Sequence, residues 1–243
     1  MANEQAVNAT FEFEPLREAR NYRQALIQEF SAHLRGRVIE AGAGIGMMTD
    51  EMLRLSSITE LLPVEPDPGF CALLREKYPK IPVVNGTLAD VPDGAIWNAI
   101  ISVNVLEHIK EDERELRRCH TLLKPGAGSL CLFVPARPEI YAPLDRDFGH
   151  FRRYTKKELT AKLERAGFTV SRIDYFNFIG YFAWWWNFCF LKQRHFDTSM
   201  VRIFDRFIFP IGHGLESRLL RPPIGQSLLA VARVPRVPAE DSR

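Results

Sequence analysis

The sequence lacks the features that mark several large classes of protein. Its four cysteines show no C-x-x-C spacing and no disulfide framework, so we expect reduced thiols and a cytoplasmic location. The 32 Lys and Arg residues nearly balance the 30 Asp and Glu residues, which argues against a nucleic-acid partner. No basic stretch followed by an apolar core opens the chain, so no signal peptide is expected. No apolar run reaches the roughly 20 residues of a spanning helix.

What the chain does contain is a glycine-rich turn between an apolar run and a helical pattern. Gly42, Gly44 and Gly46 stand at every second position after a short run that ends in Glu40. Glycine has no Cβ, so a ligand can approach the backbone closely, and the first amides of the next helix suit a polar or anionic group. A dinucleotide fingerprint would place its third glycine at position 47, which is Met47. The spacing therefore disfavours a nucleotide-dependent oxidoreductase.

The pattern E-x-G-x-G-x-G, formed by Glu40 and these glycines, resembles motif I of the class I S-adenosylmethionine-dependent methyltransferases. Glu65 closes the next apolar run, about twenty residues on, where a carboxylate can bind two ribose hydroxyls. The segment N-V-L-E-H at 104–108 adds to the resemblance, which covers about 15–175 and the last strand. It implies S-adenosyl-L-methionine (SAM) as cofactor and methyl transfer as activity. A SAM-binding protein without turnover is the alternative from another class.

The alternation of apolar runs with helical patterns predicts an α/β fold with a doubly wound, Rossmann-like parallel sheet. Strands are expected at 38–39, 61–64, 81–84, 98–103, 129–134, 168–175 and 226–234. The resemblance implies that the last two of these seven strands are antiparallel. We expect a single domain over 1–243, divided into an N-terminal capping helix at 15–36, a SAM-binding core at 37–175, an insert at 176–222 and a last strand at 223–235.

The resemblance also assigns the cofactor side of the site. A helix before the first strand caps the cofactor in the family, so Tyr22 would face the methionine end of SAM, although a plain core role is equally open. The family usually meets the adenine amino group with an acidic residue, where this chain has Thr87, so the contact falls to Thr87 or the backbone of Leu88. The predicted cofactor-binding residues are Tyr22, Glu40, Gly42, Gly44, Gly46, Glu65, Thr87, Leu88 and Asn104.

The acceptor side is expected in the loop after the fifth strand. A hydroxyl acceptor must lose a proton, and histidine has a suitable pKa for taking it. His150 lies in G-H-x-R-R-Y-T, which resembles a subset of bacterial methyltransferases that modify small molecules, lipids or cell-surface saccharides. We predict His150 as the base or acceptor-orienting residue, with His108 and Tyr154 as the other candidates. O-methylation is the first hypothesis, and N-methylation of an amine, which needs no histidine base, is the alternative.

Other polar residues of this loop leave alternatives open. Arg152 and Arg153 would bind an acceptor carboxylate or phosphate, or would brace the loop against Asp145 and Asp147. The two aspartates together with His150 also offer oxygen and nitrogen ligands for a divalent metal. Because this spacing is not diagnostic, we predict no metal site.

The most individual part of the chain separates the last two strands by roughly fifty residues, where a hairpin needs about two to five. Its aromatic start at 176–191 allows three interpretations. The aromatic residues form core over the sheet edge, a lid over a hydrophobic acceptor pocket, or a peripheral membrane contact. For the last, Trp184–Trp186 would sit at the interface and Lys192, Arg194 and Arg202 would meet anionic headgroups.

Overall fold

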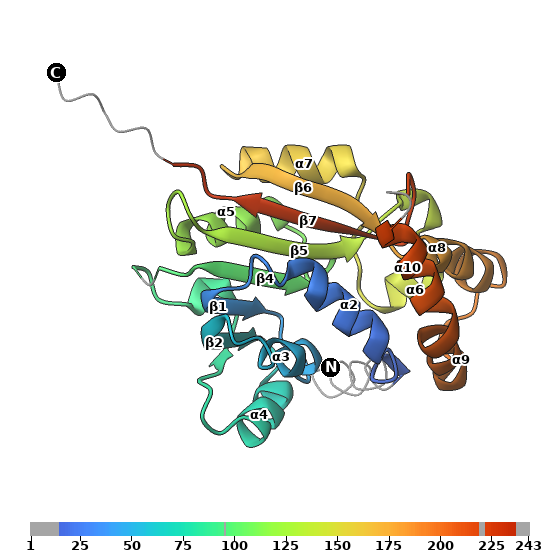
Figure 1. Cartoon of the computed structure of the whole chain (residues 1–243), viewed down its shortest axis with the longest axis horizontal. Helices are drawn as coiled ribbons and strands as arrows, with labels where there is room; N and C mark the ends of the chain where they lie inside the picture. Colours follow the sequence, from blue (N-terminus) through green and yellow to red (C-terminus); the bar gives the residue numbers. More distant parts are fainter. Residues whose placement is uncertain (1–14, 95, 219–221, 237–243) are drawn as a thin grey trace.

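A seven-stranded sheet of order β3-β2-β1-β4-β5-β7-β6 forms the centre of the computed structural model, which describes residues 15–94, 96–218 and 222–236 (Figure 1). The strands are β1 (Gly36–Ala41), β2 (Ile58–Glu65), β3 (Val84–Asn85), β4 (Ala99–Val103), β5 (Ser129–Pro135), β6 (Thr169–Phe176) and β7 (Ser227–Arg233). The first five run parallel, whereas β7 is antiparallel to both β5 and β6. The predicted sheet, with its antiparallel last pair, is confirmed.

Several strand boundaries differ from the sequence prediction, since β1 and β2 are longer at both ends and β3 is shorter. The third strand was expected at 81–84, but β3 begins only at Val84, because Pro82 has no N–H to donate to the sheet ladder. After β4, a 3₁₀ turn, η2 (Leu106–His108), precedes α5, which begins at Asp112.

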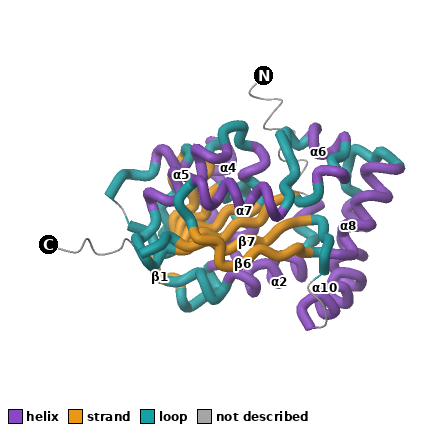
Figure 2. Tube along the Cα trace, turned by 90° about the horizontal axis from the view of Figure 1, so that it is seen from above, coloured by secondary structure: helices purple, strands orange, loops and turns teal. Residues whose placement is uncertain are grey.

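Helices cover both faces of the sheet (Figures 1 and 2). Those outside the insert are α2 (Arg20–Phe30), α3 (Met47–Met52), α4 (Pro68–Lys77), α5 (Asp112–Leu122), α6 (Pro143–Asp147) and α7 (Lys156–Arg165). Figure 2 shows α5 and α7 on one face and α2 on the other. Helix α7 starts at Lys156 because the hydroxyl of the preceding Thr155 accepts the amide of Glu158 and caps the helix. Because helices cover both faces, neither face of the central strands is exposed to solvent.

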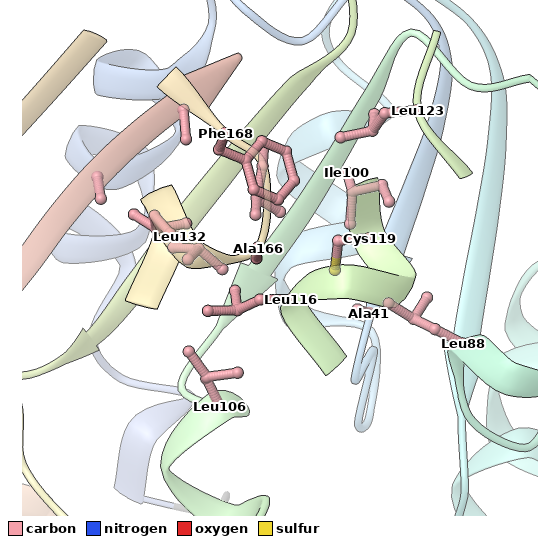
Figure 3. Packing of buried hydrophobic residues seen from close by; sticks show 14 of the residues in the cluster. Ala41, Leu88, Ile100, Leu106, Leu116, Cys119, Leu123, Leu132, Ala166 and Phe168 are labelled. Atoms are coloured by element: carbon pink, nitrogen blue, oxygen red, sulfur yellow. The ribbon is translucent and has the colours of Figure 1, made fainter. Parts of the chain in front are cut away.

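The core is therefore divided into two apolar clusters, one on each side of the sheet. Successive residues of β5 alternate between them, with Leu132 in the cluster under α5 and α7 and Phe133 in the cluster under α2. Figure 3 shows Ile100 of β4 beside Leu116 and Cys119 of α5 (Figure 3). Burial on both faces explains why these strands read as nearly continuous apolar runs.

The insert between β6 and β7 forms a helical cap at the end of the sheet to which the β4 and β5 arrows point (Figure 1). It consists of α8 (Phe178–Trp184), the π-helical turn η4 (Trp185–Phe190), α9 (Thr198–Ile203), the π-helical turn η5 (Phe204–Ile208) and α10 (Phe209–Arg218). Residues 219–221, close to the end of the insert predicted at 176–222, lie outside the described residues. Within the described part of the chain, no helix combines the length and apolarity needed to cross a bilayer.

Candidate functional site

The glycine turn closes the carboxyl end of β1 in a conformation that other residues rarely adopt. Gly42, Gly44 and Gly46 have φ angles of 74°, 54° and 81°. A Cβ on Gly42 would lie 2.4 Å from Cγ2 of Val105, so the turn packs directly on the loop after β4. Gly46 is the residue from which α3 begins. The turn is thus fixed by close packing and leaves its backbone open toward the strand ends.

Two buried carboxylates support this turn. Glu65, at the end of β2, accepts the amide of Gly44 at 2.7 Å and the amide of Asp67 at 2.9 Å. Glu40 accepts the hydroxyl of Thr49 at 2.5 Å, and its burial raises the pKa of Glu40 to about 8. Both carboxylates therefore bond to the glycine turn or to segments beside it, and the ribose contact that the resemblance implies for Glu65 stays a prediction.

A cavity of about 770 Å³ opens beside the turn, between the strand ends and the helical cap. It brings together most of the predicted site residues, from both the cofactor side and the acceptor side. The predicted residues that line it are Tyr22, Glu40, Gly42, Gly44, Asn104, His108 and His150. Asn104 is held at φ 52° at the end of β4, and its amide donates to the carbonyl of Phe133. One cavity thus joins the glycine turn to the histidines.

Other predicted residues do not line the cavity. Gly46 and Glu65 stand behind the turn, and Thr87 caps the short η1 (Leu88–Asp90). The side chain of Leu88 is buried in the core, and its carbonyl accepts Nε of Arg118 at 2.9 Å. The adenine contact expected from Thr87 or Leu88 stays a prediction.

The structure does not bring Tyr154 to the site. Its side chain is fully buried, and its hydroxyl donates to Oδ2 of Asp112 at 3.0 Å. Burial and the charge of Asp112 raise the pKa of Tyr154 far above its ordinary range. The prediction that Tyr154 is a candidate base is corrected, because this residue anchors the loop inside the core.

The acceptor-side loop holds His150 in a fixed orientation. Its Nδ1 lies 2.9 Å from Oδ1 of Asp145, whose carboxylate is completely buried and is also bonded by Nε of Arg153. Burial alone would raise the pKa of Asp145, but the hydrogen bond from His150 and the charge of Arg153 hold it below the ordinary value. Asp145 is therefore an acceptor only, so Nδ1 of His150 carries a proton and donates it to this bond.

A second histidine lies against the first. The rings of His108 and His150 meet edge to face with centroids 4.6 Å apart. Burial and the nearby His150 lower the pKa of His108 to about 4, so His108 is neutral near pH 7. Both histidines and the buried Glu107 each offer one ligand atom, and these three atoms lie within 4.8 Å of one another. These are the residues that would hold a metal ion, in place of the set with Asp145 and Asp147.

The two arginines of the loop brace it, and the alternative of direct acceptor binding is not supported by their positions. Arg153 is buried against Asp145, and Arg152 pairs with Asp112 at 2.7 Å. Asp147 pairs with Arg194 of the insert, with Nε of the arginine 2.7 Å from Oδ2. Both arginines and both aspartates of this loop thus form ion pairs within the protein.

The insert supplies the outer wall of the cavity, and Trp184 and Phe188 both line it. Trp184 donates from Nε1 to the carbonyl of Ile140 at 3.0 Å, and Arg153 lies 4.3 Å over its ring. Trp184 is only 5% exposed, whereas Trp185 is 44% exposed. One side of α8 and η4 is therefore core and cavity wall, and the other side faces outward.

Two cavity residues have local roles that the sequence either left open or missed. Tyr22 packs its ring against Phe133, Phe176 and Phe209, so it belongs to the core as well as to the cavity wall. Asn177 sits at φ 61° between β6 and α8, where its side chain accepts the amide of Gly180 and caps the helix. Asparagine directly before a helical apolar run is the signal that would have identified this cap.

The sheet order, the glycine turn after β1 and the carboxylate at the end of β2 together define the class I methyltransferase architecture. Residues 16–173 match the model of a family described as "Methyltransferase domain", and the chain belongs to this family. The sequence prediction of a SAM-dependent methyltransferase is confirmed at the level of the family.

Individual curated relatives resemble the chain at low sequence identity. A probable S-adenosylmethionine-dependent methyltransferase of Mycolicibacterium smegmatis is 28% identical over 152 residues, covering 61% of this chain and 58% of that protein. A protein of the same description from Mycobacterium tuberculosis (strain H37Rv) is 30% identical over 134 residues, covering 54% and 48%. The chain thus spans about half the length of these curated relatives.

Solved structures share the fold at low sequence identity. A putative methyltransferase of Bacillus halodurans superposes with a TM-score of 0.60 at 15% identity, covering 87% of this chain and 98% of that one. A SAM-dependent methyltransferase of Mesorhizobium loti gives 0.58 at 18% identity, covering 86% and 97%. These similarities support the fold over nearly the whole chain.

Proposed function

We propose that the chain transfers the methyl group of SAM to a hydroxyl group of a small amphipathic acceptor. The observation that carries this proposal is the pair of His150 and buried Asp145 on the wall of the cavity that also contains the glycine turn. An imidazole that is oriented by a buried carboxylate is well suited to take a proton from a hydroxyl group.

The residues behind and around the turn fit the cofactor. A Cβ on Gly42 would meet Val105 and one on Gly46 would meet Leu74, so these glycines allow the close packing that shapes the turn. Gly44 is tied to Glu65 at the position where ribose hydroxyls are expected. Glu40 and Tyr22 line the cavity on the side proposed for the methionine end. These residues would hold SAM with its methyl group directed into the cavity.

SAM supplies a methyl group activated by its sulfonium. The acceptor oxygen attacks the methyl carbon, the carbon–sulfur bond breaks with its electrons going to sulfur, and the hydroxyl proton passes to Nε2 of His150. Asp145 stabilises the imidazolium that results, while Arg153 keeps Asp145 in place. The larger contribution of the protein is to hold the two reacting groups in line.

The cavity lining supports an acceptor with an apolar part. The insert contributes Trp184, Phe188 and Phe196 to the walls, opposite the polar pair of His108 and His150. A molecule with an apolar body and one hydroxyl group matches this distribution. A ubiquinone biosynthesis O-methyltransferase of Azotobacter vinelandii, 24% identical over 136 residues, is a relative whose name specifies O-methylation.

Two measurements test the proposal. Calorimetric titration with SAM and with NAD separates a methyltransferase from an oxidoreductase, and only SAM should bind. Labelled SAM is then offered with matched pairs of compounds that carry a hydroxyl or an amine on the same scaffold, each with and without an alkyl chain. We expect label in the hydroxyl compounds, with the alkyl member favoured. Label in the amines alone would select N-methylation, and SAM binding without any transfer would favour a non-catalytic protein.

A further inference from the structure

The insert carries most of the large exposed apolar side chains among the described residues. Eleven of the fifteen large apolar side chains that are exposed among the described residues lie between 182 and 215. They include Trp186 and Phe190 of η4, Phe207 of η5 and Ile211 of α10, each more than 50% exposed. Trp186 and Phe190 stack on each other with centroids 4.9 Å apart. Exposed apolar surface concentrated in this way marks a contact with a partner or a membrane.

This apolar surface continues into the cavity. Met200, Ile203 and Ile208 are exposed to solvent and also line the cavity wall. On α8 and η4, the inward side chains Trp184 and Phe188 line the same cavity from within. The apolar tail of an acceptor therefore has a path from outside the protein to the site along apolar side chains of the insert.

The charged residues around this surface are mainly basic. Between 178 and 216 the exposed charged residues are Lys192, Arg194, Arg202, Arg206 and a single acid, Asp197. Asp205 is buried, where it caps α2 by accepting the amides of Asn21 and Tyr22. The excess of basic residues therefore faces outward.

Two of these cations have no acidic partner in the part of the chain that the structure describes. Arg194 and Arg202 pair with Asp147 and Glu18, whereas Lys192 and Arg206 form no ion pair with any described residue. Tryptophan and phenylalanine beside unpaired cations match the interface of a bilayer with anionic headgroups, and an apolar protein partner would not require those cations.

We infer that the outer face of 182–215 docks on the surface of an anionic lipid bilayer and admits an acceptor with an apolar tail directly from that bilayer. The segment lies on the membrane and does not cross it, because its apolar side chains lie on short helices. The contact predicted from 176–191 thus extends to the second helical segment. The inference that an acceptor tail enters from the bilayer depends on the proposed function, whereas the docking of the protein on the bilayer does not.

Flotation tests the docking with vesicles of phosphatidylglycerol and phosphatidylcholine in equal parts, compared with pure phosphatidylcholine. The full chain should float with the anionic vesicles at low salt. A variant with Trp186→Gln, Phe207→Gln and Ile211→Gln should stay at the bottom of the gradient. The matched control carries Leu53→Gln, Leu73→Gln and Ile96→Gln, whose side chains are also about half exposed but lie outside the insert, and it should float like wild type.

The charge contribution is tested by a variant with Lys192→Gln and Arg206→Gln. Each cation near an anionic surface contributes roughly a fivefold gain in partitioning, so this variant should bind the vesicles more than tenfold more weakly. Lipids with brominated acyl chains should quench the wild-type fluorescence. This quenching should be lost with Trp185→Phe and Trp186→Phe, since Trp97 and Trp184 are buried.

Wild type that remains at the bottom with anionic vesicles would overturn the inference. So would a stable dimer in sedimentation velocity that the triple insert variant dissociates, because the surface would then be an interface between two copies of the chain. SAM titration of the wild-type protein separates the two proposals. Wild type that binds SAM but does not float rejects the membrane and keeps the methyltransferase, and wild type that floats but does not bind SAM does the reverse.

Discussion

The imidazole of His150 and the carboxylate of Asp145 are joined by a hydrogen bond of 2.9 Å within one loop, five residues apart in the sequence. The carboxylate is inaccessible to solvent, and Arg153 neutralises it from the other side. Because Asp145 occupies Nδ1, the nitrogen left to meet an acceptor is Nε2. This pair gives the loop a chemical role on the acceptor side, separate from the glycine turn that serves the cofactor.

The first prediction concerns the glycine turn. Gly44→Val should abolish SAM binding, because valine is strained at a φ of 54° and its side chain would fill space proposed for the cofactor. Gly94→Val is the matched control, since Gly94 also has a positive φ of 81° but nothing lies within 4 Å of the added Cβ. Calorimetry should show wild-type affinity for the Gly94 variant. Equal losses in both variants would mean that strain alone is responsible.

Glu65→Ala should weaken SAM binding by roughly 1–3 kcal/mol through loss of charge-assisted hydrogen bonds. Part of this loss passes through Gly44, whose amide Glu65 holds. Glu60→Ala, on the same strand, removes a carboxylate that pairs with Arg37 away from the glycine turn and should leave affinity unchanged. Unchanged affinity in folded Glu65→Ala would remove Glu65 from the cofactor site.

The stability of the protein should fall as the pH rises from about 5 to 8, in part because of Glu40. Burial raises its folded pKa to about 8 from an ordinary 4.5, so in this window the folded state keeps a proton that the unfolded chain has lost. Glu40 lowers the free energy of unfolding by at most about 1.4 kcal/mol for each pH unit within this window.

Glu40→Gln should flatten this slope in urea unfolding measured across the window. Glu60→Gln serves as the control, because Arg37 lowers the pKa of Glu60 and its titration falls below the window. A slope that stays unchanged in Glu40→Gln would show that Glu40 is ionised in the folded protein.

The three consecutive tryptophans should respond differently to removal. Trp184→Ala should lower the free energy of unfolding by about 3–5 kcal/mol, because the ring is buried and bonded to Ile140. Trp185→Ala should change it by less than about 1 kcal/mol, since that side chain is largely exposed. Chemical denaturation measures both, and equal effects would contradict the division of this helix into inner and outer sides.

Local patterns in the sequence were sufficient to predict the sheet and the glycine turn. Strands buried on both faces give apolar runs, and the spacing of Gly42, Gly44 and Gly46 is a local property. The strand predicted at 81–84 is displaced because Pro82 interrupts the ladder, a local signal that the apolar pattern concealed.

The acceptor side was harder to predict, because its residues are distinguished by partners far apart in the chain. His150 and Tyr154 both belong to G-H-x-R-R-Y-T, yet one lines the cavity and the other bonds to Asp112, 42 residues earlier. No spacing within the motif shows which side chain turns inward. The pairing of Asp147 with Arg194 depends in the same way on how the insert folds back.

The central claim is that His150 acts on the acceptor and not on the cofactor. The most direct test is single-turnover methyl transfer from labelled SAM to the hydroxyl compound that the panel selects. The same experiment compares wild type, His150→Ala and His150→Asn, and the SAM affinity of each is measured separately. We predict unchanged SAM affinity and a chemical step slowed by roughly a hundredfold or more in both variants, because neither alanine nor asparagine accepts a proton. A wild-type rate in His150→Ala, or the loss of SAM binding in that variant, would contradict the account.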